Sequence, residues 1–163
     1  MASMDEAGWF ESGGAMVRPD WIDYNGHMNV GCYLVAFDLA TENVCVHLGV
    51  GEAYRRSADA SMFVLEAHVT YDREVHEGAP LVFRSRIVDY DTKRFHLFHR
   101  MFHAEEGYLA ATNELMCMHI DLATRRSAPF SSDAADRVRE MAAKHAGNLR
   151  GADINRRIAI RRG

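Results

Sequence analysis

NVGCYLVAFDLATENVCVHL, residues 29–48, is the strongest helix signal in this sequence. Asn29 is a suitable N-cap, and Gly49 follows the last apolar position, where glycine commonly ends a helix. Only Asp38 and Glu42 carry charge in this stretch, so we expect the helix to be buried on most of its sides. Apolar side chains recur at helical spacing at Tyr33, Phe37, Ala40, Val44 and Leu48.

After this helix the hydrophobic pattern changes to the period of two that is typical of strands. Short connections between successive strands favour antiparallel pairing, and one long helix with such a sheet is an α+β layout. We therefore expect an antiparallel sheet wrapped around one long central helix. A short strand over 15–18 ends at Pro19, and an amphipathic helix over 131–146 has Ser132 or Asp133 as its cap. The predicted strands cover residues 61–71, 81–87, 95–103 and 108–120.

Composition narrows the class of protein. The length of 163 residues fits a single domain, with a core over about 15–130 and the last helix over about 131–146. A formal charge of -4 argues against nucleic acid as a partner. The first residues lack the apolar run of a signal peptide, and no stretch reaches the roughly 18 uncharged apolar residues of a membrane span. Cys32, Cys45 and Cys117 form no CxxC pair, so free thiols and a cytoplasmic location are expected.

The segment just ahead of the helix, WIDYNGHMN at residues 21–29, carries the most specific pattern. Asp23 stands three residues before Gly26 at the entry to the helix. This arrangement resembles the hotdog-fold thioesterases of the 4-hydroxybenzoyl-CoA thioesterase type, and the strand and glycine turn over 66–78 resemble the same family. The resemblance covers roughly residues 15–130.

The resemblance implies a hotdog fold, an acyl-CoA thioesterase that hydrolyses a small acyl-CoA to the free acid and CoA, and a homodimer or tetramer. It implies no cofactor, since CoA is part of the substrate. Exposed strand edges independently favour pairing of two copies. Residues 17–38 and the Ala-Thr-Asn-Glu segment at 111–114 resemble betainyl-CoA thioesterases in particular, which act in carnitine breakdown. That likeness points to betainyl-CoA as the substrate.

Asp23 is the candidate for the chemistry. A thioester is cleaved by attack of a carboxylate, or of water that a carboxylate activates, on its carbonyl carbon. The charge that develops on the carbonyl oxygen needs a donor already in place, and a helix N-terminus offers unpaired N–H groups. The resemblance assigns that role to the backbone amide of Val30. The alternative for Asp23 is that it braces the turn that Gly26 makes possible.

Other polar residues have two interpretations each. His27 either orients the substrate or bonds to the backbone across the turn, and Asn29 is either a helix cap or a ligand. Glu66 lies on a strand, on the face opposite Phe63 in a regular alternation. The resemblance directs Glu66 toward the active site of a partner subunit, whereas a solvated strand face is the plain alternative. Asn113, in the last strand, is a similar candidate for substrate binding.

A betainyl group is a quaternary ammonium, which aromatic faces and nearby carboxylates hold. The aromatic residues of this sequence that could hold such a group are equally suitable as core residues. CoA also carries phosphates, for which the paired basic residues 55–56, 93–94, 125–126 and 156–157 are candidates. Solvation at the surface is the alternative for each pair, and the sequence does not choose among them. The aromatic candidates for the acyl group are Trp21, Tyr24, Tyr33 and Phe37.

A metal site is not expected. The spacing of His96, His99 and His103 aligns ligands on a helix, but on the predicted strand His96 faces away from the other two. Cys32 and Cys45 fall within the apolar helix, which favours a buried structural role over that of a nucleophile.

Two other functions fit the same fold. A hotdog module that only binds or senses acyl-CoA would not need a carboxylate at the helix entry, so Asp23 favours the enzyme. A hydratase or dehydratase would resemble a different motif, with a catalytic His or Glu in the helix segment, and no such motif is found.

Overall fold

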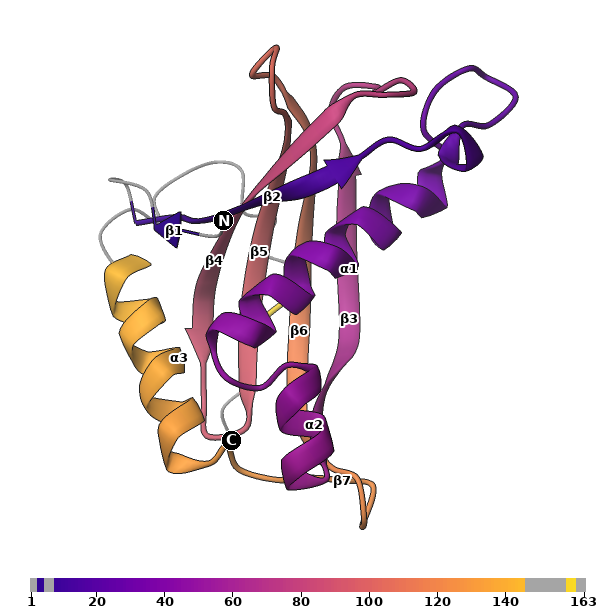
Figure 1. The fold of residues 1–163 in the computed structure, drawn as a ribbon. Coiled ribbons are helices and arrows are strands. Elements are labelled where there is room, and N and C mark those ends of the chain that lie inside the picture. The colour runs from indigo at the N-terminus through magenta and orange to yellow at the C-terminus, as the bar shows by residue number, and fades with distance from the viewer. Residues whose placement is uncertain (1–2, 5–7, 146–157, 161–163) are drawn as a thin grey trace.

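The computed structural model describes residues 3–4, 8–145 and 158–160. A seven-stranded antiparallel sheet has the order β1-β2-β4-β5-β6-β3, with β7 paired to β6, and the long helix α1 lies across one of its faces (Figure 1). This is the α+β hotdog architecture that the sequence predicts. The elements are β1 (Ser3–Met4), β2 (Phe10–Met16), a 3-10 turn η1 (Pro19–Trp21), α1 (Val30–His47), α2 (Glu52–Ala58), β3 (Ala60–Tyr71), β4 (Pro80–Tyr90), β5 (Arg94–His103), β6 (Leu109–Asp121), β7 (Arg126–Ser127) and α3 (Ser132–His145).

The four long strands β3 to β6 begin and end within a few residues of the predicted positions, but β2 does not. It covers Phe10–Met16 instead of 15–18 and pairs with β4. The pairing shifts register between Gly13 and Ala15, and Gly14 has a φ of 109°, which only glycine adopts readily. The two glycines therefore form a bulge inside a strand.

Helix α1 begins as predicted, with the Asn29 side chain accepting a hydrogen bond from the Gly31 amide at 2.9 Å. The prediction that α1 is buried on most of its sides is wrong for the single chain. Ala36, Phe37 and Ala40 are fully buried, but the opposite side of the helix is open. A sheet covers one side of a helix, and the rest of this apolar surface stays exposed. The exposed apolar residues of α1 are Val30, Leu34, Val35, Leu39 and Val46.

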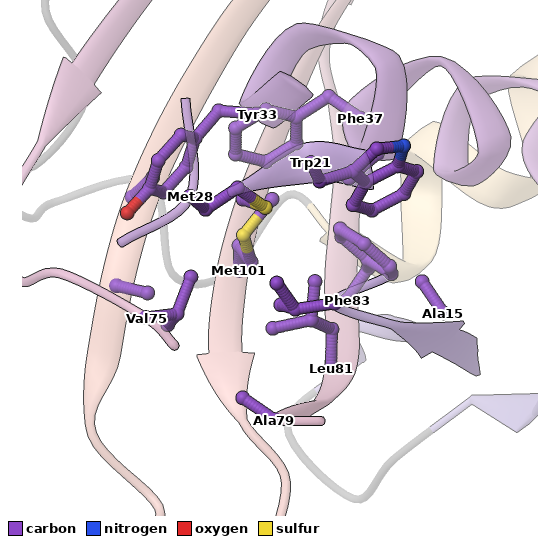
Figure 2. Close-up of a cluster of buried hydrophobic side chains, with 14 of the residues drawn as sticks. Ala15, Trp21, Met28, Tyr33, Phe37, Val75, Ala79, Leu81, Phe83 and Met101 are labelled. Atoms are coloured by element: carbon purple, nitrogen blue, oxygen red, sulfur yellow. The ribbon is translucent and has the colours of Figure 1, made fainter. Parts of the chain in front are cut away.

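A cluster of buried side chains lies under the N-terminal half of α1 (Figure 2). Met28 and Tyr33 contribute to it from the helix entry, and Val75 contributes from the loop that follows β3. The Met28 amide also donates to the Val75 carbonyl at 2.9 Å. This contact holds the segment before α1 against the end of β3, although the two are far apart in the sequence.

A second buried cluster joins α3 to the C-terminal half of α1 and to the strands beneath it. The cap of α3 is Ser131, whose side-chain oxygen accepts from the Ala134 amide at 3.4 Å, and not Ser132 or Asp133 as predicted. Ser132 is already the first helical residue. The predicted last residue of this helix, Ala146, lies outside the described residues.

Helix α2 was not predicted from the sequence. It is a seven-residue helix with no buried residue, so its sequence lacks the apolar face by which periodicity predicts a helix. None of the described helices is long and apolar enough by itself to cross a membrane, and α1 and α2 meet the length and composition requirement only as a pair bent by 56°.

Candidate active site

The segment between η1 and α1 folds into a tight loop around Asp23. The Asp23 amide donates to the His27 carbonyl at 3.1 Å, and the Gly26 amide donates to the Asp23 carbonyl at 3.0 Å. Gly26 has a φ of 82°, so the loop requires glycine there. The amide of Asn25 donates to Oδ1 of Asp23 at 2.8 Å. One carboxylate oxygen is thus fixed by the loop.

The second oxygen of Asp23 has no hydrogen bond or ion pair within the described chain. The amide of Val30, the first residue of α1, likewise donates to no acceptor there, because the Asn29 cap accepts from Gly31 instead. The loop therefore presents a carboxylate oxygen and a helix N-terminal amide that are both available to a ligand.

Both groups line one hollow, which we call the helix-entry hollow, with a volume of about 480 Å³. It brings together most of the residues predicted as catalytic or substrate-binding. It also includes four residues that the sequence did not single out, from the end of β3 and the loop after it. The lining residues are Asp23, Tyr24, Asn25, His27, Met28, Asn29, Val30, Tyr33, Tyr71, Asp72, Arg73 and Glu74.

Local hydrogen bonds already engage His27 and Asn29. Nδ1 of His27 lies 3.2 Å from the Met28 carbonyl and, when protonated, donates to it. Its other ring nitrogen has no bond among the described residues. Asn29 is the helix cap, which agrees with the plainer of its two interpretations. Both side chains line the hollow, so a second role in substrate binding fits their positions.

Trp21 and Phe37 are not brought to the hollow. Both are buried in the core cluster of Figure 2, with 6% and 0% of their surfaces exposed. Their aromatic faces are therefore core surfaces. Tyr24 lines the hollow and is exposed, whereas Tyr33 lines it from the edge of the same core cluster and is 4% exposed.

Glu66 lies away from the hollow. A bulge between Val64 and Glu66 shifts the register of β3, so that Glu66 pairs with Met116 and Phe63 pairs with Met118. Partners two residues apart share a face, so Glu66 lies on the same face of the sheet as Phe63 and not on the opposite one. This is the face turned away from α1.

Asn113 lies under α1, in a second hollow of about 350 Å³ between this helix and β3. The side chain is fully buried, and neither its Oδ1 nor its Nδ2 has a partner among the described residues. Gly31 lines this second hollow and adjoins Val30 in the first. The side-chain amide of Asn113 is therefore buried without a hydrogen-bond partner among the described residues. It lines the second hollow and not the helix-entry hollow that the Asp23 loop lines.

The histidines on β5 lie as predicted, with His99 and His103 on the α1 side of the sheet and His96 on the other. His99 connects α1 to the sheet, since its Nε2 lies 3.1 Å from the Thr41 hydroxyl and its Nδ1 lies 2.7 Å from the Ser85 hydroxyl. Burial lowers the pKa of the His99 imidazole to about 3, so this side chain is neutral. The described residues contain no group of three or more candidate metal ligands.

The cysteines fit a structural role. Burial raises the pKa of the Cys45 thiol to about 12, so almost none of it is the nucleophilic thiolate.

Of the basic pairs considered for CoA, Arg56 pairs with Glu52 at 2.9 Å and Arg94 with Asp91 at 2.6 Å. The pair at 156–157 lies outside the described residues.

Comparison with known proteins agrees with this architecture. A model of the thioesterase-like superfamily matches residues 17–138. The betainyl-CoA thioesterase of Pseudomonas aeruginosa is 36% identical over 129 residues, which are 79% of this chain and 81% of that protein. The L-carnitine dehydrogenase/betainyl-CoA thioesterase of Agrobacterium fabrum is 37% identical over 69% of this chain, which spans only 23% of that longer relative. A Staphylococcus aureus protein solved in complex with CoA has a TM-score of 0.84 at 29% identity, covering 99% of each chain.

Proposed function

Because the chain belongs to the thioesterase-like superfamily and is an acyl-CoA thioester hydrolase, we propose that its substrate is betainyl-CoA, which it hydrolyses to the free acid and CoA. The relative from Pseudomonas aeruginosa is a betainyl-CoA thioesterase, and this chain spans 81% of it. The reaction needs no cofactor, since CoA enters as part of the substrate.

The observation that carries the proposal is that Asp23 and Val30 line the same hollow. When the thioester carbonyl oxygen accepts a hydrogen bond from the Val30 amide, the amide stabilises the negative charge that develops on that oxygen. The free oxygen of Asp23 then acts on the carbonyl carbon or on a water beside it. His27, on the same hollow, orients the thioester.

Two routes give the same products. In the first, Asp23 takes a proton from water as the water adds to the carbonyl carbon. The C–S bond then breaks, and the proton goes to the CoA thiolate. In the second, Asp23 itself adds to the carbon and expels the CoA thiolate, and water then hydrolyses the resulting mixed anhydride. Both routes consume one water and release one acid and one thiol.

The working unit is a homodimer or a homotetramer. Support comes from the open apolar side of α1 and from β3, which ends the sheet as an edge strand and exposes Phe63, Val64 and Leu65. A long apolar edge strand is a template for pairing with a second copy. Three free cysteines among the described residues fit a cytoplasmic enzyme.

The test is an assay of thiol release from betainyl-CoA, straight short-chain acyl-CoAs and aromatic acyl-CoAs. Betainyl-CoA is expected to have the highest kcat/KM of the panel. Faster hydrolysis of another member would refute betainyl-CoA as the substrate while keeping the enzyme class. Tight binding of acyl-CoA with no thiol release from any member would instead indicate a module that only senses the ligand.

A further inference from the structure

Tyrosine and acidic side chains from two distant parts of the chain meet at the helix-entry hollow. Tyr33 comes from the first turn of α1, whereas Tyr71 ends β3. The loop that follows β3 adds Asp72 and Glu74. The Ala110 carbonyl on β6 accepts from the Asp72 amide at 2.9 Å, which fixes the start of this loop.

Tyr71 contacts Val30, the residue whose amide we assign to the thioester oxygen. Its hydroxyl donates to the Val30 carbonyl at 3.3 Å, and its ring meets the Tyr33 ring edge to face, with centroids 5.1 Å apart and planes at 84°. About half of the Tyr71 side chain, 51%, remains exposed. Tyr71 therefore has free aromatic surface and lines the same hollow as Val30.

The charges around the hollow are mainly negative. Asp23, Asp72 and Glu74 contribute carboxylates, against the guanidinium of Arg73 and the imidazole of His76, whose Nε2 lies 3.5 Å from Glu74 and is cationic only when the ring is protonated. That guanidinium lies over the ring of Tyr108, 4.0 Å from its centroid, and so already has an aromatic partner. A ligand group in the hollow meets aromatic surface and an excess of negative charge. This combination suits a cation whose outer atoms are apolar.

We propose that Tyr71, whose ring packs against the buried Tyr33, binds a quaternary ammonium in the acyl group together with Asp72 and Glu74, and selects it over a neutral group of the same shape. This assignment rests on the proposed function. A trimethylammonium has no N–H to donate, so ring faces and nearby carboxylates are the groups that recognise it. In betainyl-CoA one methylene joins this cation to the carbonyl carbon, which matches the position of Tyr71 next to Val30.

The sharpest test compares betainyl-CoA with 3,3-dimethylbutanoyl-CoA, in which carbon replaces the quaternary nitrogen. The wild-type kcat/KM is expected to be higher for betainyl-CoA. Tyr71→Leu should reduce this preference about tenfold, the size of a partly desolvated cation–aromatic contact. The double variant Asp72→Asn with Glu74→Gln should reduce it in the same direction. Tyr71→Phe, which keeps the ring, should retain most of the preference.

A matched control replaces two exposed carboxylates of α3 that do not line the hollow, Asp133→Asn with Glu140→Gln, and should leave the preference as in the wild type. Equal losses for both substrates in Tyr71→Leu would overturn the assignment and leave Tyr71 with a purely structural role. Equal wild-type kcat/KM values for the two esters would also overturn it, without touching the thioesterase assignment.

A binding measurement separates this assignment from the proposed activity. In an Asp23→Asn background, calorimetry with both CoA esters is expected to show tighter binding of betainyl-CoA, and Tyr71→Leu should remove that difference. If wild-type protein hydrolyses no ester yet this difference persists, the subsite stands and the proposed function fails. If the two esters bind equally, the subsite is wrong whatever the activity.

Discussion

At the scale of single residues, the site depends on two groups that the fold leaves without partners. The Asp23 loop uses one carboxylate oxygen to hold itself together and leaves the other open. The Asn29 side chain satisfies the Gly31 amide and leaves the Val30 amide open. A turn and a helix cap, each an ordinary local structure, thus leave an acceptor and a donor on two residues of one hollow, which are the groups that the proposed reaction uses.

Asp23→Asn is expected to lower kcat about a thousandfold or more, because an amide neither attacks a carbonyl nor takes a proton from water. The amide oxygen still accepts from Asn25, so the melting temperature should change little. Steady-state thiol release and thermal denaturation check the two statements. Asp20→Asn, at an exposed aspartate paired with Arg18, is the control and should keep full turnover. Substantial activity in Asp23→Asn would show that the carboxylate is not the catalyst.

At the scale of elements, α1 is joined to the sheet by a buried polar contact within an otherwise apolar interface. Thr41 on α1 and Ser85 on β4 both bond to His99 on β5. The Thr41 hydroxyl also lies 3.0 Å from the Phe37 carbonyl of its own helix, to which it donates. Such contacts fix the position of the helix along the strands, since apolar packing alone is not directional.

This contact predicts an acid dependence of stability. Burial lowers the pKa of His99 to about 3 in the folded protein, whereas an unfolded histidine titrates near its ordinary value of 6.5. Below pH 6.5 the His99 imidazole is therefore protonated in the unfolded chain but stays neutral in the folded protein. The free energy of unfolding should fall by about 1.4 kcal/mol per pH unit on this account as the pH drops from 6.5 toward 3.

Urea unfolding of the wild type and His99→Gln between pH 6.5 and 5 measures this slope. The variant should be less stable at pH 7 but should lose less stability per pH unit. His76→Gln, at an exposed histidine, removes an imidazole without touching the buried contact and serves as the control. Parallel pH profiles for wild type and His99→Gln would contradict the assignment.

At the scale of the whole molecule, the single chain leaves a large apolar surface uncovered. It extends over the open side of α1 and the edge strand β3, and it borders the second hollow with Asn113. Exposed apolar surface of this extent typically marks an interface. A second copy seated there would bury the helix on the side that the sheet does not reach.

Leu39→Lys is expected to shift the protein from an assembly of two or four copies to the 18.4 kDa monomer. A charge at the centre of an apolar interface is left without a partner when the interface forms. Sedimentation equilibrium measures the change. Ala143→Lys, at an exposed position on α3, is the matched control and should keep the assembly. A monomeric wild type at micromolar concentration would contradict the proposed oligomer.

The sequence by itself determined the features that depend on neighbours along the chain. Periodicity located α1 and the four long strands, Asn29 identified the helix start, and the spacing of Asp23 and Gly26 indicated the candidate loop before the helix. Each of these signals acts over a few residues, through a cap, a turn or the alternation of a strand, so each can be recognised before any tertiary contact forms.

The tertiary structure alone decided what depends on distant contacts. It placed Tyr71 and Glu74 beside the Asp23 loop through the Met28–Val75 hydrogen bond, and it buried Trp21 in the core. A bulge turned Glu66 to the far face, because one extra residue reverses the alternation of a strand. Such features follow from how elements dock on one another, and neither composition nor periodicity encodes that docking locally.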